Sequence, residues 1–156
     1  MKRDIKKLLI SLALPLAVGG LAALLSRGGM ADYAGLVRPP LSPPGWVFPV
    51  VWTVLYLLMG YSAYLVWTSG GDPAQVRRAL GLYGAQLFLN FLWPILFFGL
   101  AWRLPAFFLL VGLWLLILMT INAFSKINER AGDLLIPYIL WVTFAGYLNL
   151  GTYLLN

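Results

Sequence analysis

The run LPAFFLLVGLWLLILMTINAFS, from Leu104 to Ser125, contains no charged residue over 22 positions. A helix needs about 20 mostly apolar residues to cross the hydrocarbon core of a bilayer. The run is long enough for one membrane span, and charged residues bound it on both sides, Arg103 before it and Lys126 after it. The sequence predicts a transmembrane helix over residues 104–126.

The same pattern continues on both sides of this run. Four further uncharged stretches of similar or greater length divide the chain, which is 62% hydrophobic and only 10% charged. A soluble domain is about 45–50% apolar and about 25% charged, so lipid is the expected surrounding of this chain. We predict an all-α integral membrane protein, a single domain over residues 1–156 built as a bundle of five transmembrane helices. The expected spans are 8–26, 45–68, 75–102, 104–126 and 134–155.

Lys and Arg are divided unequally between the two sides that five spans create. The N-terminus and the second and fourth connections carry eight of them, and the other side carries three. The eight are Lys2, Arg3, Lys6, Lys7, Arg77, Arg78, Lys126 and Arg130, and the three are Arg27, Arg38 and Arg103. Because cytoplasmic loops collect Lys and Arg, we expect a cytoplasmic N-terminus and an extracytoplasmic C-terminus. The proline-rich connection 27–44 is then extracytoplasmic, and its stiff backbone would cap that end of the bundle.

Polar and aromatic residues are sorted onto single faces of the predicted helices. They recur at the spacing of a helical turn, and polar side chains within a membrane turn toward the bundle interior. The residues on these faces that we predict to bind a ligand are Trp52, Tyr56, Tyr83, Gln86, Asn90, Trp93, Tyr138, Trp141, Ala145 and Asn149.

Two interpretations of these faces are open. The amides can hold helices together by hydrogen bonds worth about 0.6 kcal/mol each, and aromatic residues also belong to belts at the membrane surface. Alternatively, aromatic walls with a few amides form a pocket for a flat, largely apolar ligand. Trp52, Tyr56 and Trp141 lie in the middle of their spans, which favours a pocket. Gln86, Asn90 and Asn149 would orient the ligand, and the proline-rich connection with Arg38, Pro43 and Pro44 would form its lid.

Composition excludes several classes of chemistry. The chain has no Cys and no His, so it can form no disulfide and lacks the commonest metal ligand and acid–base group. Charged residues occur only at the ends of the predicted spans (Arg77, Arg78 and Lys126) and none lies at membrane depth, which argues against ion coupling. We expect no metal and no required cofactor. Any catalysis would take its reactivity from the bound ligand, with Trp52 and Trp141 as the candidate residues.

Small residues recur in the third predicted span. Gly81 and Ala85 are four positions apart, with Gly84 beside them. Pairs of small residues at this spacing let two helices approach closely. They would serve either a homodimer or the packing of helices within one chain.

The most specific segments of the chain stand in a fixed order between Tyr33 and Asn156. They are Arg38-Pro39, Pro43 to Pro49 with Trp52, Leu55-Tyr56, Tyr83, Gln86, Leu89-Asn90, Trp93, Phe97-Phe98, Leu135, Pro137-Tyr138, Trp141, Phe144-Ala145 and Leu148-Asn149. In order and spacing they resemble the TspO/MBR family. That family comprises the tryptophan-rich sensory proteins of bacteria and the mitochondrial translocator protein, also called the peripheral benzodiazepine receptor.

The resemblance implies a five-helix membrane bundle, commonly a homodimer, in a bacterial cell membrane. It implies ligands such as porphyrins, sterols and synthetic benzodiazepine-type aromatics, and it places Trp52, Asn90, Trp141 and Ala145 in the pocket wall. This chain departs from the family at Asp32 and Leu41, where the family often has Trp. It also has no basic residue after Tyr147 or Tyr153, so the C-terminal cholesterol motif of the animal members is absent.

Four functions fit these observations. The leading hypothesis is a membrane receptor or sensor that binds a porphyrin, with protoporphyrin IX preferred over haem because no His or Cys can ligate iron. The others are a light- and oxygen-dependent porphyrin-degrading activity, a passive transporter of porphyrin-like amphiphiles, and an oligomeric membrane scaffold. Lipid and a small apolar molecule are the expected partners. Nucleic acid is not, because the net charge of +6 sits in short clusters between the spans.

Overall fold

The computed structural model describes the backbone of residues 2–156 and the side chains from Asp4 onward. The side chains of Lys2 and Arg3, on which the expected orientation partly depends, lie outside the described part. Within it, five helical segments are long and apolar enough to cross a membrane, which confirms the predicted fold class. The helices that form these segments are α1 (Lys2–Ala34), α2 (Val47–Trp67), α3 (Pro73–Pro94), α4 (Arg103–Ile127) and α6 (Ile136–Leu155).

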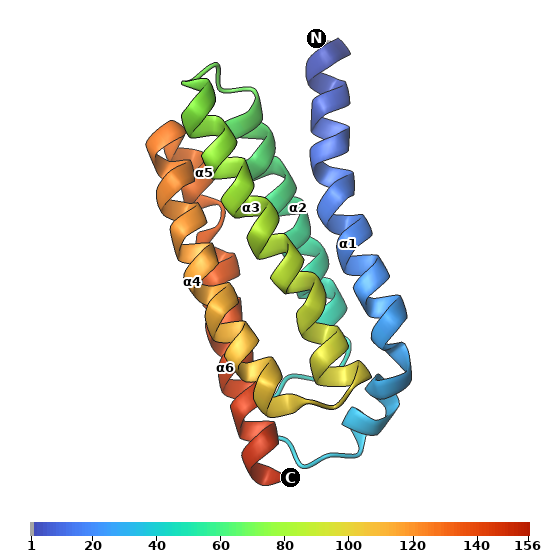
Figure 1. Ribbon diagram of the computed structural model, residues 1–156. Helices are drawn as coiled ribbons and strands as arrows, with labels where there is room; N and C mark the ends of the chain where they lie inside the picture. Colours follow the sequence, from blue (N-terminus) through green and yellow to red (C-terminus); the bar gives the residue numbers. More distant parts are fainter. Residues whose placement is uncertain (1) are drawn as a thin grey trace.

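The helices run alternately up and down, so the two termini lie at opposite ends of the bundle (Figure 1). The end that holds the N-terminus also contains the α2–α3 turn and the short helix α5 (Glu129–Asp133). The end that holds the C-terminus contains the α1–α2 connection and the turn between α3 and α4 (Figure 1). We call these the N-terminal end and the C-terminal end. Which end faces the cytoplasm stays a prediction.

Helix α1 is longer than the sequence predicted. The prediction ended the first span at Ser26 because Arg27 follows, whereas the helix continues to Ala34. A charge ends the apolar run but does not break a helix, and α1 stops only before the prolines that begin at Pro39. Gly29 lets this extension of α1 pack directly against the segment after α3. Any residue with a Cβ atom at this position would collide with the backbone carbonyl of Phe98. The connection between α1 and α2 is therefore shorter than the predicted 27–44.

Proline also shapes the end of α3. Asp72 caps the start of this helix by accepting a hydrogen bond from the Gln75 amide at 3.3 Å. Near the other end, Pro94 has no N–H to donate to the carbonyl of Asn90, one turn earlier. The chain then widens into a π-helical turn, η1 (Ile95–Gly99), closed by the Leu100 amide on the Ile95 carbonyl at 2.9 Å. Phe97 and Phe98 of this wide turn form part of the wall of a cavity within the bundle.

The last predicted span, 134–155, corresponds to α6, and the short helix α5 precedes it. Asn128 caps α5 by accepting a hydrogen bond from the Ala131 amide, and α6 begins afresh with Pro137 in its first turn. The hydroxyl of Ser62 on α2 donates to the Ala131 carbonyl, which ties α5 into the bundle. Large apolar side chains on the outer surface of the helices are exposed, including Leu9, Phe88, Phe108 and Leu140. These are the side chains that lipid would cover in a membrane.

Candidate ligand-binding site

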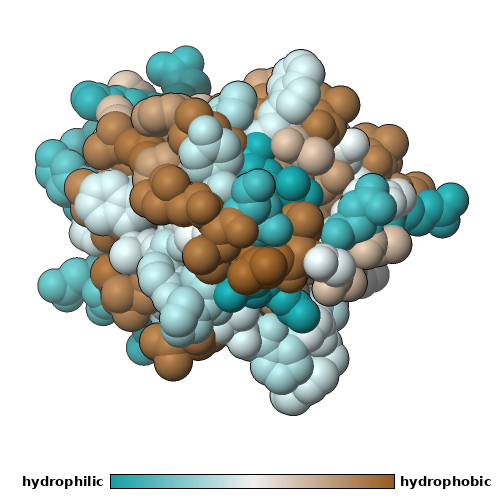
Figure 2. Space-filling view, turned by 90° about the horizontal axis from the view of Figure 1, so that it is seen from below, coloured by the Kyte–Doolittle hydropathy of each residue, from teal (hydrophilic) through white to brown (hydrophobic). Residues whose placement is uncertain are grey.

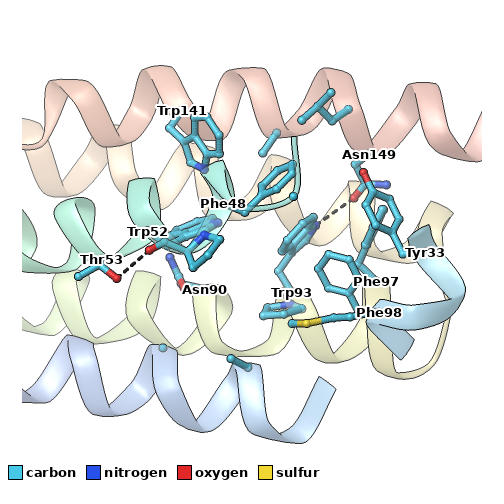
Figure 3. Close-up of a pocket in the computed structure, with 18 of the residues that line it drawn as sticks. Tyr33, Phe48, Trp52, Thr53, Asn90, Trp93, Phe97, Phe98, Trp141 and Asn149 are labelled. Carbon is cyan, nitrogen blue, oxygen red and sulfur yellow. Dashed lines mark hydrogen bonds between the residues drawn. The ribbon is translucent and has the colours of Figure 1, made fainter. Parts of the chain in front are cut away.

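A cavity of about 590 Å³ lies in the C-terminal half of the bundle. Helices α1, α2, α3, η1 and α6 and the α1–α2 connection all contribute to its wall (Figure 3). The lining residues are Leu16, Gly19, Gly20, Ala23, Met30, Tyr33, Ala34, Arg38, Gly45, Phe48, Pro49, Trp52, Thr53, Tyr56, Asn90, Trp93, Pro94, Phe97, Phe98, Trp141, Ala145, Leu148 and Asn149. Small-molecule sites commonly have volumes of about 300–1,000 Å³ and mostly apolar walls, so this cavity has the size and character of such a site.

One group of aromatic side chains surrounds the inner part of the cavity. Trp52 stacks on Tyr56 with their ring centroids 5.5 Å apart, and it meets Trp141 edge-on at 6.5 Å. Phe48 packs against Trp141 at 5.9 Å. Offset and edge-on pairs of this kind are the favoured arrangements of aromatic rings. The group fixes the Trp52 and Trp141 rings on facing helices, α2 and α6 (Figure 3).

A second aromatic group surrounds the part of the cavity near the C-terminal end. Trp93 stacks on Phe97 at 5.0 Å, and Tyr33 meets both Phe97 and Phe98 edge-on at 5.5 and 5.2 Å. These rings belong to α1, α3 and η1, and the π-helical turn is what brings Phe97 and Phe98 beside Tyr33 (Figure 3). The two groups together leave a space between flat apolar surfaces.

At the inner end of the cavity, polar side chains form a buried chain of hydrogen bonds that begins in the wall and continues beyond it. The Tyr56 hydroxyl donates to Asn90 Oδ1 at 2.9 Å, and Asn90 Nδ2 donates to the Tyr138 hydroxyl at 2.8 Å. Tyr138 in turn donates to Gln86 Oε1 at 2.7 Å. Each link joins two different helices, so the chain holds α2, α3 and α6 at fixed separations. A buried polar group that lost its partner here would be costly.

The amide of Asn149 is used in the same way nearer the C-terminal end. Its Oδ1 accepts from Trp93 Nε1 at 2.9 Å, and its Nδ2 donates to the Arg103 carbonyl at 2.8 Å. By contrast, Trp141 Nε1 is buried and has no partner within the described residues. The amides that reach the cavity are therefore already engaged, and Trp141 keeps a free N–H donor.

The sequence itself is similar to that of known proteins over most of its length. A profile of the TspO/MBR family matches residues 11–154. The chain is 36% identical to the tryptophan-rich protein TspO of Chlorobaculum tepidum over 157 aligned positions, which cover 100% of this chain and 99% of that protein. It is 40% identical to the translocator protein of Bos taurus, with 87% of this chain and 82% of the relative aligned. It is 39% identical to a tryptophan-rich sensory protein of Cereibacter sphaeroides, with coverages of 80% and 76%.

The chain belongs to the TspO/MBR family. The match confirms the resemblance that the order of the Trp, Asn and Pro residues indicated. As a TspO/MBR protein with five spans, it is an integral membrane protein.

The structure brings most of the predicted site residues of this TspO/MBR protein to one cavity. Seven of the predicted ligand-binding residues line it, together with Arg38 from the predicted lid. The seven are Trp52, Tyr56, Asn90, Trp93, Trp141, Ala145 and Asn149. Their contact with a ligand stays a prediction, since the cavity shows where they lie and not what they bind.

Three predicted residues do not reach the cavity. Tyr83, Gln86 and Tyr138 are buried beyond Asn90, toward the N-terminal end. Helical periodicity identified their inward-facing side correctly, but it does not tell at which depth in the membrane a cavity ends. Pro43 and Pro44 are also absent from the wall, where Gly45 takes their place.

Other wall residues were missed by the sequence analysis. Phe48 precedes Trp52 by four positions and Tyr56 by eight, so the helical repeat could have included it. Tyr33, Phe98 and Met30 come from the longer α1 and from the π-helical turn, which no periodic pattern indicated. Gly81 and Ala85 lie on the exposed outer surface of α3, where nothing lies within 4 Å of a Cβ placed at Gly81. A homodimer through this surface stays a prediction.

Proposed function

We propose that this protein is a membrane receptor or sensor that binds a porphyrin in the cavity between its helices. The observation that carries the proposal is the cavity itself: about 590 Å³, with Trp52, Trp141, Trp93 and Phe97 presenting flat aromatic surfaces to one space. A porphyrin ring is flat and largely apolar, and stacking on such surfaces suits it. The TspO/MBR relatives include a tryptophan-rich sensory protein, which supports a sensory role.

The residue types favour a free-base porphyrin over haem. The chain contains no His and no Cys, the side chains that most often hold haem iron. The binding energy would come from apolar contact and stacking and not from a bond to iron. Sterols and other flat apolar molecules of similar size are expected to compete for the same space.

A titration with protoporphyrin IX tests the proposal. We expect saturable quenching of tryptophan fluorescence at micromolar or lower ligand concentration, lost in a triple variant with Trp52→Phe, Asn90→Ala and Trp141→Phe. Trp67→Phe is the matched control, because Trp67 lies at the N-terminal end and does not line the cavity. Equal, weak quenching in all three proteins would show that the porphyrin only partitions into detergent. Tighter binding of haem would contradict the preference for the metal-free ring.

A second candidate function is the light- and oxygen-dependent breakdown of the bound porphyrin. The observation that favours it is the edge-on contact of Trp52 and Trp141 at 6.5 Å, both in the cavity wall, since indole rings are readily oxidised. If this activity exists, illumination in oxygen should destroy bound pigment faster than free pigment. Trp52→Phe or Trp141→Phe should remove the difference while leaving part of the binding. Equal rates for bound and free pigment would exclude it.

A further inference from the structure

A second hollow lies on the outer surface of the bundle, between α2 and α6. It is an open groove of about 520 Å³. The residues that line it are all apolar: Val50, Val51, Val54, Leu55, Leu58, Pro137, Leu140, Trp141 and Phe144. Leu55 is buried and lies at the bottom of the groove, whereas Val54 and Leu140 are 50% and 64% exposed and form its two edges. Trp141 lines this outer groove and the inner cavity alike.

The ring of Trp141 therefore separates the two spaces. On the cavity side it meets Trp52 edge-on at 6.5 Å and Phe48 at 5.9 Å. On the groove side it packs against Phe144, with the ring centroids 5.6 Å apart. Because packed side chains transmit a displacement to their neighbours, a molecule in the groove would support the aromatic wall on which a cavity ligand lies.

The groove lies at the depth of the hydrocarbon core of a membrane. Helix α2 begins at Val47 and α6 ends at Leu155, both at the C-terminal end (Figure 1). At a rise of 1.5 Å per residue, Val54 is about 10 Å and Leu140 about 22 Å from that end, within a core about 30 Å thick. The C-terminal end itself mixes hydrophilic with hydrophobic side chains, as the polar surface of a membrane requires (Figure 2). Lipid chains, and not lipid head groups, reach the groove.

The chemistry of the lining favours a plain hydrocarbon chain as the occupant. The lining contains no charged side chain, and its one side-chain N–H, Trp141 Nε1, is buried. A sterol hydroxyl or a porphyrin carboxylate in this groove would lose its water and find no partner, which is unfavourable. An acyl chain carries no polar group at this depth, and by filling the groove it gains contacts that an empty space would forfeit.

We propose that the groove between α2 and α6 binds one lipid acyl chain, and that this chain supports Trp141 from outside and strengthens ligand binding in the inner cavity. The lipid site is independent of the proposed function, and only its effect on affinity rests on that function. With the chain in place, the Trp141 ring is already held when the ligand arrives, so less freedom is lost on binding. By reciprocity, a bound cavity ligand strengthens retention of the lipid.

Native mass spectrometry tests the lipid site, because it counts the phosphatidylcholine molecules that each protein chain retains on release from detergent. We expect the wild type to retain one. Val54→Phe and Leu140→Phe each place a ring in the groove from one edge and should retain none. Val111→Phe is the matched control, because Val111 is 44% exposed on α4 and lines neither space. Equal retention by the wild type and Val54→Phe would overturn the site. Lipid-free pairs of wild-type chains that Val54→Phe separates would overturn it in favour of a second copy of the protein.

The affinity for protoporphyrin IX tests the effect on the cavity. It is measured by tryptophan quenching, with and without added phosphatidylcholine, in a sterol-based detergent that supplies no acyl chain of its own. We expect the lipid to raise the affinity of the wild type and of Val111→Phe about five-fold. In Val54→Phe the new ring takes the place of the lipid, so the affinity should be high without lipid and unchanged by it. A wild-type affinity that lipid does not alter would overturn the effect on the cavity. Absence of porphyrin binding in every variant would overturn the proposed function, while lipid retention alone still decides the site.

Discussion

The two halves of this bundle differ in what lies between α2, α3 and α6. In the N-terminal half, small residues let the helices touch: a Cβ atom at Gly60 would come within 2.5 Å of the Ser11 carbonyl oxygen. In the C-terminal half, the rings of Trp52, Trp93 and Trp141 stand between the helices and a cavity remains. Both halves are built from inward-facing residues of the same helices. The difference shows that residue size at each level, and not the polar or apolar pattern alone, decides where the bundle closes.

The boundary between the halves is the hydrogen-bond chain from Tyr56 through Asn90 and Tyr138 to Gln86. On one side of it these polar groups hold helices together, as one interpretation of the sequence expected. On the other side Asn90 forms part of the cavity wall, as the other interpretation expected. The same stripe of residues therefore serves both purposes at different depths.

The largest expected effect is a loss of stability in the N-terminal half, the closed half, where α1 and α2 touch. In Gly60→Ala, the new methyl group would lie 2.5 Å from the Ser11 carbonyl oxygen and 2.8 Å from Leu12 Cα, both backbone atoms of α1. Because backbone atoms cannot give way without moving a helix, we expect a loss of about 3 kcal/mol in the free energy of unfolding. Unfolding in mixed detergent, followed by circular dichroism, measures it.

Gly84→Ala is the control for this substitution. Gly84 lies on the exposed surface of α3, and nothing lies within 4 Å of a Cβ placed there. Since Ala has the higher helix propensity, we expect stability to stay equal or rise by about 0.5–1 kcal/mol. Equal behaviour of Gly60→Ala and Gly84→Ala would show that the closed half does not depend on close contact between α1 and α2.

The next effect is a loss of porphyrin affinity when the cavity of the C-terminal half, the hollow half, is filled. Ala145→Leu adds a branched side chain to a buried position in the cavity wall. Because the space is open, we expect the protein to remain folded while porphyrin affinity falls by about 100-fold. Ala85→Leu, on the exposed surface of α3, is the control and should leave affinity unchanged. Unaltered affinity in Ala145→Leu would place the ligand outside this cavity.

A smaller effect is expected where the two halves meet. Tyr138→Phe removes the hydroxyl that accepts from Asn90 and donates to Gln86. Both amides then lose a buried partner, and we expect a loss of about 1–2 kcal/mol in the free energy of unfolding. Tyr153→Phe, where the side chain is 42% exposed, should cost nothing measurable. A Tyr138→Phe protein as stable as the wild type would show that this hydrogen-bond chain is not needed to hold α2, α3 and α6 together.

The sequence predicted which side of α2, α3 and α6 faces inward, but not how the two halves differ. The stripe through Tyr83, Gln86, Asn90 and Trp93 was found from spacing alone, because polar groups must leave the lipid. The depth along the helices at which the cavity ends could not be predicted, since it depends on which neighbouring side chains are small enough for the helices to touch. The π-helical turn after Pro94 and the continuation of α1 past Arg27 escaped it as well. Both arise from contacts between distant segments, such as Gly29 with Phe98, which no local pattern contains.

The smallest expected effect concerns the connection between α1 and α2, which closes the hollow half at the C-terminal end. The side-chain amide of Asn156 accepts from the Val37 N–H at 3.1 Å and donates to the Val37 carbonyl at 2.7 Å. The Tyr147 hydroxyl donates to the Pro40 carbonyl at 2.7 Å. All of these contacts are exposed, so each contributes only about 0.5–1 kcal/mol. These hydrogen bonds hold the segment that carries Arg38, a residue of the cavity wall, against α6.

Removing the hydrogen bonds of Asn156 and Tyr147 tests whether the connection between α1 and α2 acts as a lid. In Asn156→Ala we expect bound porphyrin to leave about three-fold faster in stopped-flow displacement, with the stability of the helices unchanged. Tyr147→Phe should also speed the release of porphyrin, and release from the double variant should be faster than from either single variant. Tyr153→Ala, on the same helix, is the control. A double variant that releases ligand at the wild-type rate would mean that the connection does not limit exit, and that the ligand leaves sideways between the helices into the lipid.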